Sequence, residues 1–245
     1  MRDIIEILDS DPNIGVVTRK NTPGEELELV KQFICFKKNM FKPSLTNKLA
    51  IFVEPKIGNS YPDIVFVEYN PDNFEHWSDA RFQLTSRDLK ILYHIYATCS
   101  IDTSGIVDQL GMTWKEAALG VEKLYDANLI IRKNKKWHLK NKEAVRVNKI
   151  EAVEAKINKW EEVFQQAIIN KNFASESYAL SKVASTPREA TVKKLNSFGI
   201  GLYIKSRVGF QTMAEAWKSS IPVSFNSIFF NEWIGRALQT DERTV

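Results

Sequence analysis

The sequence predicts an α/β protein in which a central mixed sheet flanked by helices is interrupted by a mostly helical segment. Three patterns support this class: a helix followed by two strands over residues 25–69, helical periodicity over residues 84–140, and strand patterns that return after residue 144. The 245 residues, 44% of them hydrophobic, suffice for a large core. We expect residues 1–80 and 143–245 to form that core and residues 81–142 to form an inserted domain.

The first block reads as helix, strand, turn, strand. A helix is predicted over residues 25–40, because its apolar positions share one face: Leu27, Leu29, Val30, Phe33, Ile34, Phe36 and Phe41. Strands are predicted over residues 49–53 and 64–69, with a turn at residues 56–60. The unbroken apolar run of residues 64–67 indicates a central strand that is buried on both faces.

The middle block carries three helix-start signals. Thr85 with Asp88 caps the first helix, Asp102 precedes a short second helix that ends at Gly111, and Thr113 opens the third. Residues 129–139 then predict a short hairpin with a polar tip. Three helices with a tight second turn, followed by a basic hairpin, resemble a winged helix-turn-helix.

The last block returns to strand patterns. Alternating residues from Ala144 to Ile157 predict a strand, and a helix follows from Trp160 to Asn172. Short strands are predicted at residues 178–180 and 200–205. From Met213 onward we predict helical packing around Phe229, Trp233 and Leu238.

Positive charge is concentrated in one stretch of the chain. The net charge is +4, but residues 131–160 hold ten basic and three acidic residues, a local charge of +7, so the remainder carries −3. Such a concentration is expected of a protein that meets phosphates. The alternative interpretation is a solvated lysine-rich loop.

Several classes are disfavoured by what the sequence lacks. Two cysteines, Cys35 and Cys99, are too few for a disulfide framework and fit a reducing compartment, so we expect a cytoplasmic protein. Residues 1–15 contain several acids and lack the apolar run of a secretory signal, and no apolar stretch approaches the ~20 residues of a membrane-spanning helix. A nucleotide-binding Gly-x-x-x-x-Gly-Lys loop is also lacking, which argues against an ATP-driven motor.

The candidate chemistry centres on two carboxylates and one amine. Asp63 opens the apolar strand at residues 64–69, and strand periodicity places Glu154 and Lys156 on one face of a later strand. If these strands are neighbours, Asp63 and Glu154 could hold a divalent metal while Lys156 orients a water or stabilises charge on a phosphate.

These residues resemble the PD-(D/E)XK nuclease superfamily, which includes many restriction-type endonucleases. Pro62-Asp63 is similar to its first element and Glu154-Ala155-Lys156 to its second. The helix with Trp160, Phe164, Gln166 and Ala167 and the strand with Tyr178 look like the helix and strand that come after the lysine in many members. The resemblance implies a restriction-endonuclease-like fold that cuts DNA with Mg²⁺, or with Mn²⁺ as a substitute.

The resemblance also implies a role for each site residue. Asp63 and Glu154 would bind the metal, the carbonyl of Ala155 would complete the coordination, Lys156 would assist the attack of water, and Gln166 would be a supporting polar residue. Some members carry an additional acid on the first helix. Either Glu25 or Glu26 could be that acid, and we expect Glu26.

The main departure from the family is the length between the two acidic elements. Most relatives join them by a short hairpin, whereas 91 positions separate Asp63 from Glu154. An inserted domain explains the gap, since domain termini often lie close together and the cost of closing a loop grows slowly with length. Using Glu68-Tyr69-Asn70 as the second element fails, because five positions along a strand point Asp63 and Glu68 to opposite faces.

The inserted domain supplies the candidate DNA contacts. Thr113, Trp114 and Lys115 begin the predicted recognition helix, the end that commonly approaches base edges, although Trp114 is the better fit to a buried core position. The hairpin cations are candidates for phosphate contacts: Arg132, Lys133, Lys135 and Lys136.

Two functions from different classes remain at this point. The first is a metal-dependent endonuclease acting on double-stranded DNA, in which a homodimer or a partner subunit would supply a second active centre. The second is a non-catalytic DNA-binding regulator or assembly factor on a nuclease-like scaffold, because fold alone does not fix function.

Overall fold

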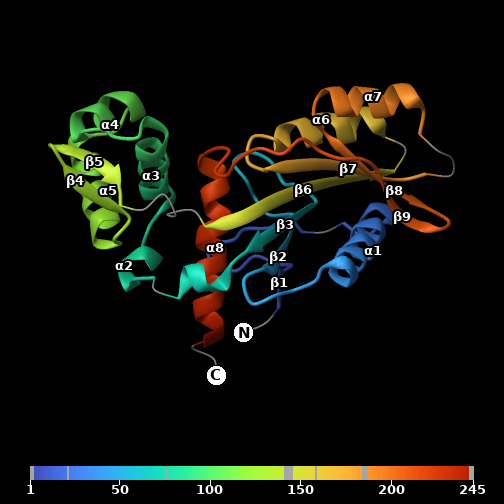
Figure 1. The fold of residues 1–245 in the computed structure, drawn as a ribbon, viewed down its shortest axis with the longest axis horizontal. Helices are drawn as coiled ribbons and strands as arrows, with labels where there is room; N and C mark the ends of the chain where they lie inside the picture. Colours follow the sequence, from blue (N-terminus) through green and yellow to red (C-terminus); the bar gives the residue numbers. More distant parts are fainter. Residues whose placement is uncertain are drawn as a thin grey trace. The chain divides into compact units, whose positions relative to one another are not determined.

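The computed structural model describes residues 3–20, 22–75, 77–140, 146–157, 159–183 and 187–242. Contacts divide the chain into two compact units (Figure 1). The sheet unit comprises Met1–Pro71 and Val147–Ser227, and the helical unit comprises Asp72–Arg146 and Ile228–Val245. The sheet unit is thus built from two separated stretches of sequence.

The sheet unit is an α/β structure around seven strands. The strands are β1 (Ile4–Ile7), β2 (Lys48–Val53), β3 (Ile64–Tyr69), β6 (Val147–Ile157), β7 (Glu176–Lys182), β8 (Gly201–Ser206) and β9 (Gly209–Ala214), in that spatial order. Pairing is antiparallel for β2–β3, β3–β6 and β8–β9, and parallel for β1–β2, β6–β7 and β7–β8. The predicted mixed sheet is therefore confirmed, with β3 and β6 near its centre.

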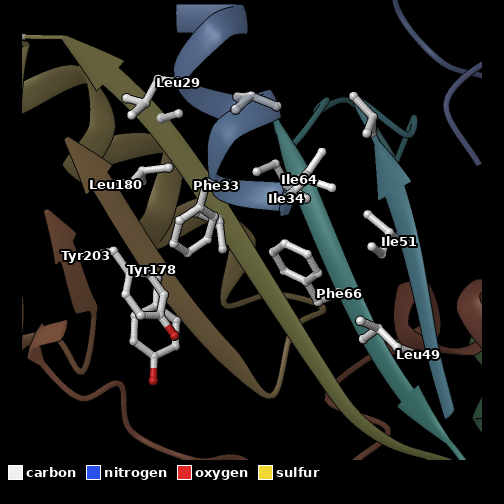
Figure 2. Close-up of a cluster of buried hydrophobic side chains, with 14 of the residues drawn as sticks. Leu29, Phe33, Ile34, Leu49, Ile51, Ile64, Phe66, Tyr178, Leu180 and Tyr203 are labelled. Atoms are coloured by element: carbon white, nitrogen blue, oxygen red, sulfur yellow. The ribbon is translucent and has the colours of Figure 1, made fainter. Parts of the chain in front are cut away.

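Helix α1 (Glu25–Met40) covers one face of this sheet. Its Phe33 is fully buried, with its ring 6.0 Å from Phe66 and 4.9 Å from Tyr203 between centroids. Figure 2 shows Phe33 and Ile34 of the helix over strand residues that include Ile64 and Phe66. The predicted apolar face of residues 25–40 is confirmed, since Leu29 and Val30 join the same core.

Helices α6 (Trp160–Asn170) and α7 (Glu189–Ser197) contribute to the core on the other face. Phe164 and Ala167 of α6 share a core with Ala179 of β7, whereas the neighbouring Tyr178 and Leu180 belong to the α1 side. This alternation follows from the period of two along a strand. Helices on both sides explain why residues 64–67 are apolar without interruption.

The helical unit begins in the short helix η1 (Pro71–Phe74), which spans the boundary. It contains α2 (Asp79–Phe82), α3 (Ser86–Thr98), α4 (Thr103–Leu110), α5 (Trp114–Asp126) and a hairpin of β4 (Ile130–Lys133) and β5 (Lys136–Leu139). The predicted caps are confirmed: Thr85 with Asp88 and Thr113 with Glu116 form capping boxes, and Gly111 ends α4 in the left-handed conformation. Asn134 and Lys135 both have positive φ, as a tight two-residue hairpin turn requires.

The last helix, α8 (Phe225–Glu242), corrects one predicted boundary. From Ile228 onward the chain belongs to the helical unit, although residues 143–245 were all predicted to complete the core. Glu232 of α8 forms a buried ion pair with Arg81, at 2.7 Å between Oε1 and Nη2, and Arg81 stacks 3.6 Å over the ring of Trp77. These partners lie more than 150 positions earlier, so local sequence could not reveal them.

Other differences concern weakly patterned segments. Strand β1 and helix α7 were not predicted, and Met213 lies in strand β9 rather than in helical packing. The start of the predicted strand at residues 144–145 lies outside the described residues. Within the described part of the chain, no helix combines the length and apolar character needed to cross a membrane.

Candidate active site

The register of two central strands brings the predicted acids together. Ile64 of β3 pairs with Val153 of β6 in antiparallel register, so Asp63, one residue before, lies opposite Glu154, one residue after. Directly opposed residues in such a ladder point to the same face, with Cβ atoms roughly 4.5–5.5 Å apart. Sheet pairing thus places side by side two carboxyl groups that are 91 positions apart in sequence.

Asp63 is surrounded by a backbone donor and two cations from two segments, strand β6 and the stretch that carries Arg19. Its Oδ2 accepts a hydrogen bond of 2.7 Å from the backbone N–H of Ala155 and lies 3.8 Å from the ammonium of Lys156. Its Oδ1 lies 4.0 Å from a terminal nitrogen of Arg19. Since a backbone donor and two cations surround it, the negative charge of Asp63 is well compensated.

Glu154 has a much poorer supply of donors. Its side chain is only 2% exposed, Oε1 accepts a hydrogen bond of 3.0 Å from Asn170 of α6, and Oε2 has no hydrogen-bond partner among the described residues. Burial, followed by the nearby charge of Asp63, raises the pKa of Glu154 well above its usual value. Glu154 therefore holds a proton more tightly than an exposed glutamate does.

Glu151, three positions earlier on the same strand, provides an internal comparison. It is as deeply buried, but its carboxylate lies 2.6 Å from Lys37 and 2.8 Å from Lys149. Burial would raise the pKa of Glu151, yet the two ammonium groups outweigh burial and lower it. The fold thus neutralises Glu151 internally and leaves Glu154 in need of a positive charge.

Lys156 completes the predicted cluster, and its contacts show which acid of the first helix lies near the site. Its ammonium donates to Glu26 at 3.2 Å and to the carbonyl of Ala155 at 3.1 Å. Burial alone would lower the pKa of Lys156, but the surrounding acids, led by Asp63 and Glu26, raise it overall. Glu26 is therefore the acid near this site, whereas Glu25 faces Lys182 at 4.0 Å.

The polar residue that α6 supplies to the site is Asn170. Gln166, predicted for this role, lies one turn earlier, and its Oε1 is buried without a hydrogen-bond partner among the described residues. Asn170 is 1% exposed and bonds directly to Glu154. Both residues lie on the same helix at a spacing of four, so the sequence alone offered no basis for preferring the later one.

Two further residues at the site had no predicted role. Glu54 directly follows β2, and its backbone N–H donates to the carbonyl of Asp63 at 3.1 Å, which continues the β2–β3 pairing by one residue. Arg19 forms an ion pair through Nε with the Glu54 carboxylate. The end of a predicted strand next to Asp63 would have pointed to Glu54, whereas Arg19 comes from an irregular segment and had no local signal.

The oxygens available here fit a divalent cation such as Mg²⁺. Within the ranges that the structure describes, no group of three His, Cys, Asp or Glu side chains could hold a metal ion. The possible ligands here are the carboxylates of Asp63 and Glu154 and the carbonyl of Ala155. Mg²⁺ commonly takes one or two carboxylates and keeps several waters. The buried Oε2 of Glu154, which has no hydrogen-bond partner in the described part of the chain, and the raised pKa of Glu154 fit a position that would accept a cation.

The predicted DNA-contacting residues all lie in the helical unit. Trp114 is 60% exposed at the start of α5, so the expectation that it is a core residue was wrong. Lys115 is also exposed, while the Thr113 hydroxyl is engaged with Glu116 in the helix cap.

The hairpin places its cations in solvent. The four predicted side chains are all exposed, and no ion pair involving them occurs among the described residues: Arg132, Lys133, Lys135 and Lys136. Arg132 lies over the ring of Trp137, 5.5 Å from its centroid. The hairpin thus presents four exposed cations, although Arg132 lines a hollow together with Glu122 and Asp126.

Comparisons with known proteins add no assignment. A scan against models of protein families, a search of curated proteins and a search of solved structures each return no match for this chain.

Proposed function

We propose that the protein is a Mg²⁺-dependent endodeoxyribonuclease of the PD-(D/E)XK type. The observation that carries the proposal is the convergence of Asp63 and Glu154 on adjacent strands, with Lys156 beside them. Mn²⁺ is expected to substitute for Mg²⁺, because both cations accept oxygen ligands.

The order of elements in the sheet unit supports this restriction-endonuclease-like assignment. Helix α1 is followed by β2, by β3 after Pro62-Asp63, by β6 with Glu154-Ala155-Lys156, and then by α6 and β7. This is the order on which the sequence resemblance rests. The long insertion, residues 72–146, lies between β3 and β6, where it leaves their pairing intact.

The site residues divide the chemistry of phosphodiester hydrolysis among them. A bound Mg²⁺ would polarise the phosphate and make its coordinated water more acidic. Asp63 and Glu154 hold the cation, and the carbonyl of Ala155 offers a third oxygen. Because the pKa of Lys156 is raised, its side chain is an ammonium at neutral pH. It therefore orients a water or stabilises negative charge developing on the phosphate, and it does not act as a base.

The helical unit contributes binding rather than chemistry in this proposal. Its three helices and basic hairpin resemble a winged helix, and the exposed cations at the hairpin tip supply phosphate contacts that are independent of base sequence. Trp114 and Lys115 at the start of α5 are exposed, which supports contacts to base edges in this proposal. The expected partner is double-stranded DNA.

One observation favours a second function, a non-catalytic DNA-binding regulator or assembly factor. Within the described residues only two carboxylates meet at the metal-binding position, and the third acid, Glu26, is bonded to Lys156. Such a protein would keep the exposed cations of the helical unit and would bind DNA without cutting it.

Cleavage of supercoiled plasmid in the presence of Mg²⁺ tests the proposal. We expect the wild type to cut, and Asp63→Asn and Lys156→Ala each to lose at least a hundredfold in rate, with DNA binding retained. Glu25→Gln is the matched control, because Glu25 is an exposed acid on α1 that lies 4.0 Å from Lys182. Cleavage that survives both site variants, or that is never seen while DNA binds, rejects the nuclease.

The first product of the same assay reports on assembly. One active centre cuts one strand and yields nicked circles first, whereas direct linearisation requires two centres. Early linear product would favour a homodimer or a partner subunit.

A further inference from the structure

Arg19 reaches the candidate active site from a segment outside the seven-stranded sheet. That segment is fastened to the end of β2: Thr18 bridges Pro55, the backbone N–H of Lys56 donates to Val17 at 2.8 Å, and that of Arg19 donates to Glu54 at 3.1 Å. Ile14 and Val16 anchor it in the core. The backbone of Arg19 is therefore fixed next to Asp63 and Glu54.

The Arg19 side chain is bonded to Glu54, lies 5.7 Å from the ring centroid of Tyr61 and remains partly exposed. Its Nε donates to Glu54, a residue whose backbone adopts a left-handed φ of 46°, which is costly for a residue other than glycine. Among the described residues, no hydrogen bond occupies its two terminal nitrogens, and the side chain is 54% exposed. The two terminal nitrogens thus carry four N–H donors beside the metal-binding acids, and one of these nitrogens lies 4.0 Å from Asp63.

The charge of Arg19 becomes available once a cation binds. In this structure its guanidinium lies 4.0 Å from Asp63 and interacts electrostatically with Glu154. A divalent ion on those two carboxylates would neutralise them and leave Arg19 as an additional positive charge at the mouth of the site. The guanidinium fork matches two oxygens of a phosphate, which an ammonium cannot do.

We propose that Arg19 binds the non-bridging oxygens of the phosphate that is cut, oriented for this task by Glu54. This inference rests on the proposed nuclease function and adds a phosphate-binding residue to it. Lys156 and Arg19 then have different roles: Lys156 lies deep beside Glu26, and Arg19 contacts the substrate from the exposed side.

The experiment measures three quantities on Arg19→Ala and Arg19→Lys. They are the plasmid cleavage rate, the hydrolysis of bis(p-nitrophenyl) phosphate, and the rise in melting temperature caused by Mg²⁺. The small diester is used because it is too short to contact the helical unit. Arg207→Ala is the matched control, since Arg207 is an exposed arginine of the sheet unit.

We expect Arg19→Ala to lower kcat/KM on both substrates by about ten- to a hundredfold, the range for a lost charge-assisted contact. Arg19→Lys should recover only part of this loss. The Mg²⁺-induced rise in melting temperature should be at least as large in Arg19→Ala as in the wild type, because a competing cation has been removed.

Two results would overturn the inference. One is unchanged hydrolysis of both substrates by Arg19→Ala. The other is loss of the Mg²⁺ effect together with activity, which would make Arg19 a structural support of the acids.

A wild type that cuts no DNA rejects the proposed function instead. Arg19 is then judged by calorimetric binding of bis(p-nitrophenyl) phosphate with Mg²⁺ present. Weaker binding by Arg19→Ala supports the phosphate contact, and equal binding of wild type and variant rejects it.

Discussion

Replacing Glu154, whose pKa is raised, by glutamine should stabilise the metal-free protein at alkaline pH. Glu154→Gln keeps the shape of the side chain and an oxygen that can accept the bond from Asn170. The variant also removes a charge that must otherwise be buried opposite Asp63. We therefore expect a gain in stability together with a loss of metal binding.

The magnitude follows from the geometry of the pair. Two carboxylates about 5 Å apart, as their cross-strand position implies, repel by about 3 kcal/mol at an effective dielectric constant near 20. Lys156 and Arg19 reduce this repulsion, so we expect Glu154→Gln to gain about 1–3 kcal/mol near pH 8.

The pH dependence has a definite sign. The folded protein holds the Glu154 proton more tightly than the unfolded chain does, because the folded-state pKa is raised. Wild-type stability therefore falls as pH rises from about 4.5 through the folded pKa, and it is constant above that. Glu154→Gln lacks this loss, so the difference between the two proteins should vanish below about pH 4.5.

Urea unfolding across this pH range, with EDTA present, measures the effect. Glu151→Gln is the control with the opposite sign: it leaves Lys37 and Lys149 without their shared partner and should cost about 3–5 kcal/mol at neutral pH. That cost should shrink in acid, because the lowered pKa of Glu151 means that its stabilisation is lost as pH falls through the folded value. Two results would refute the reasoning: a Glu154→Gln protein that is less stable than the wild type near pH 8, or a difference in unfolding free energy between the two proteins that is the same at every pH.

Three further predictions concern binding and packing. Neutralising the four hairpin cations should weaken DNA binding and lower the slope of log K against log[salt] by up to about 0.9 per lost phosphate contact. Fluorescence anisotropy across a salt series measures this slope. An unchanged slope would argue against the hairpin, as would the same change in a control that lacks four exposed cations of the sheet unit: Lys31, Lys193, Arg207 and Lys218. Gly201→Ala should cost about 1–3 kcal/mol in urea unfolding, because its Cβ would lie 2.2 Å from the ring of Tyr178, whereas Gly24→Ala meets no atom within 4 Å and should be nearly neutral. Glu232→Ala should cost about 3–5 kcal/mol by leaving Arg81 buried without its carboxylate, and a cost below about 1 kcal/mol would mean that this ion pair adds little.

Local features of the chain were predictable because their causes lie within a few residues. The helix of residues 25–40 follows from apolar spacing, and the caps at Thr85 and Thr113 follow from hydrogen bonds to residues three positions on. Strand β3 matches its predicted bounds, because a short continuous apolar run between turn residues is typical of a buried strand.

Properties that depend on distant partners were decided only by the tertiary structure. Glu151 and Glu154 look alike in sequence, yet one meets two lysines and the other meets Asp63 and Asn170, so their pKa values move in opposite directions. Arg19 at the site and the place of α8 in the helical unit likewise arise from segments far away in sequence.

The sequence by itself determined the strongly patterned elements, their caps and the residue types available for chemistry, but it did not reveal β1, α7 or β9. Tertiary structure determined which acid of α1 approaches Lys156, which buried glutamate has a raised pKa and that Trp114 faces solvent. The physical reason is that periodicity and capping act over one turn of chain, whereas burial and ionisation depend on every segment that packs around a group.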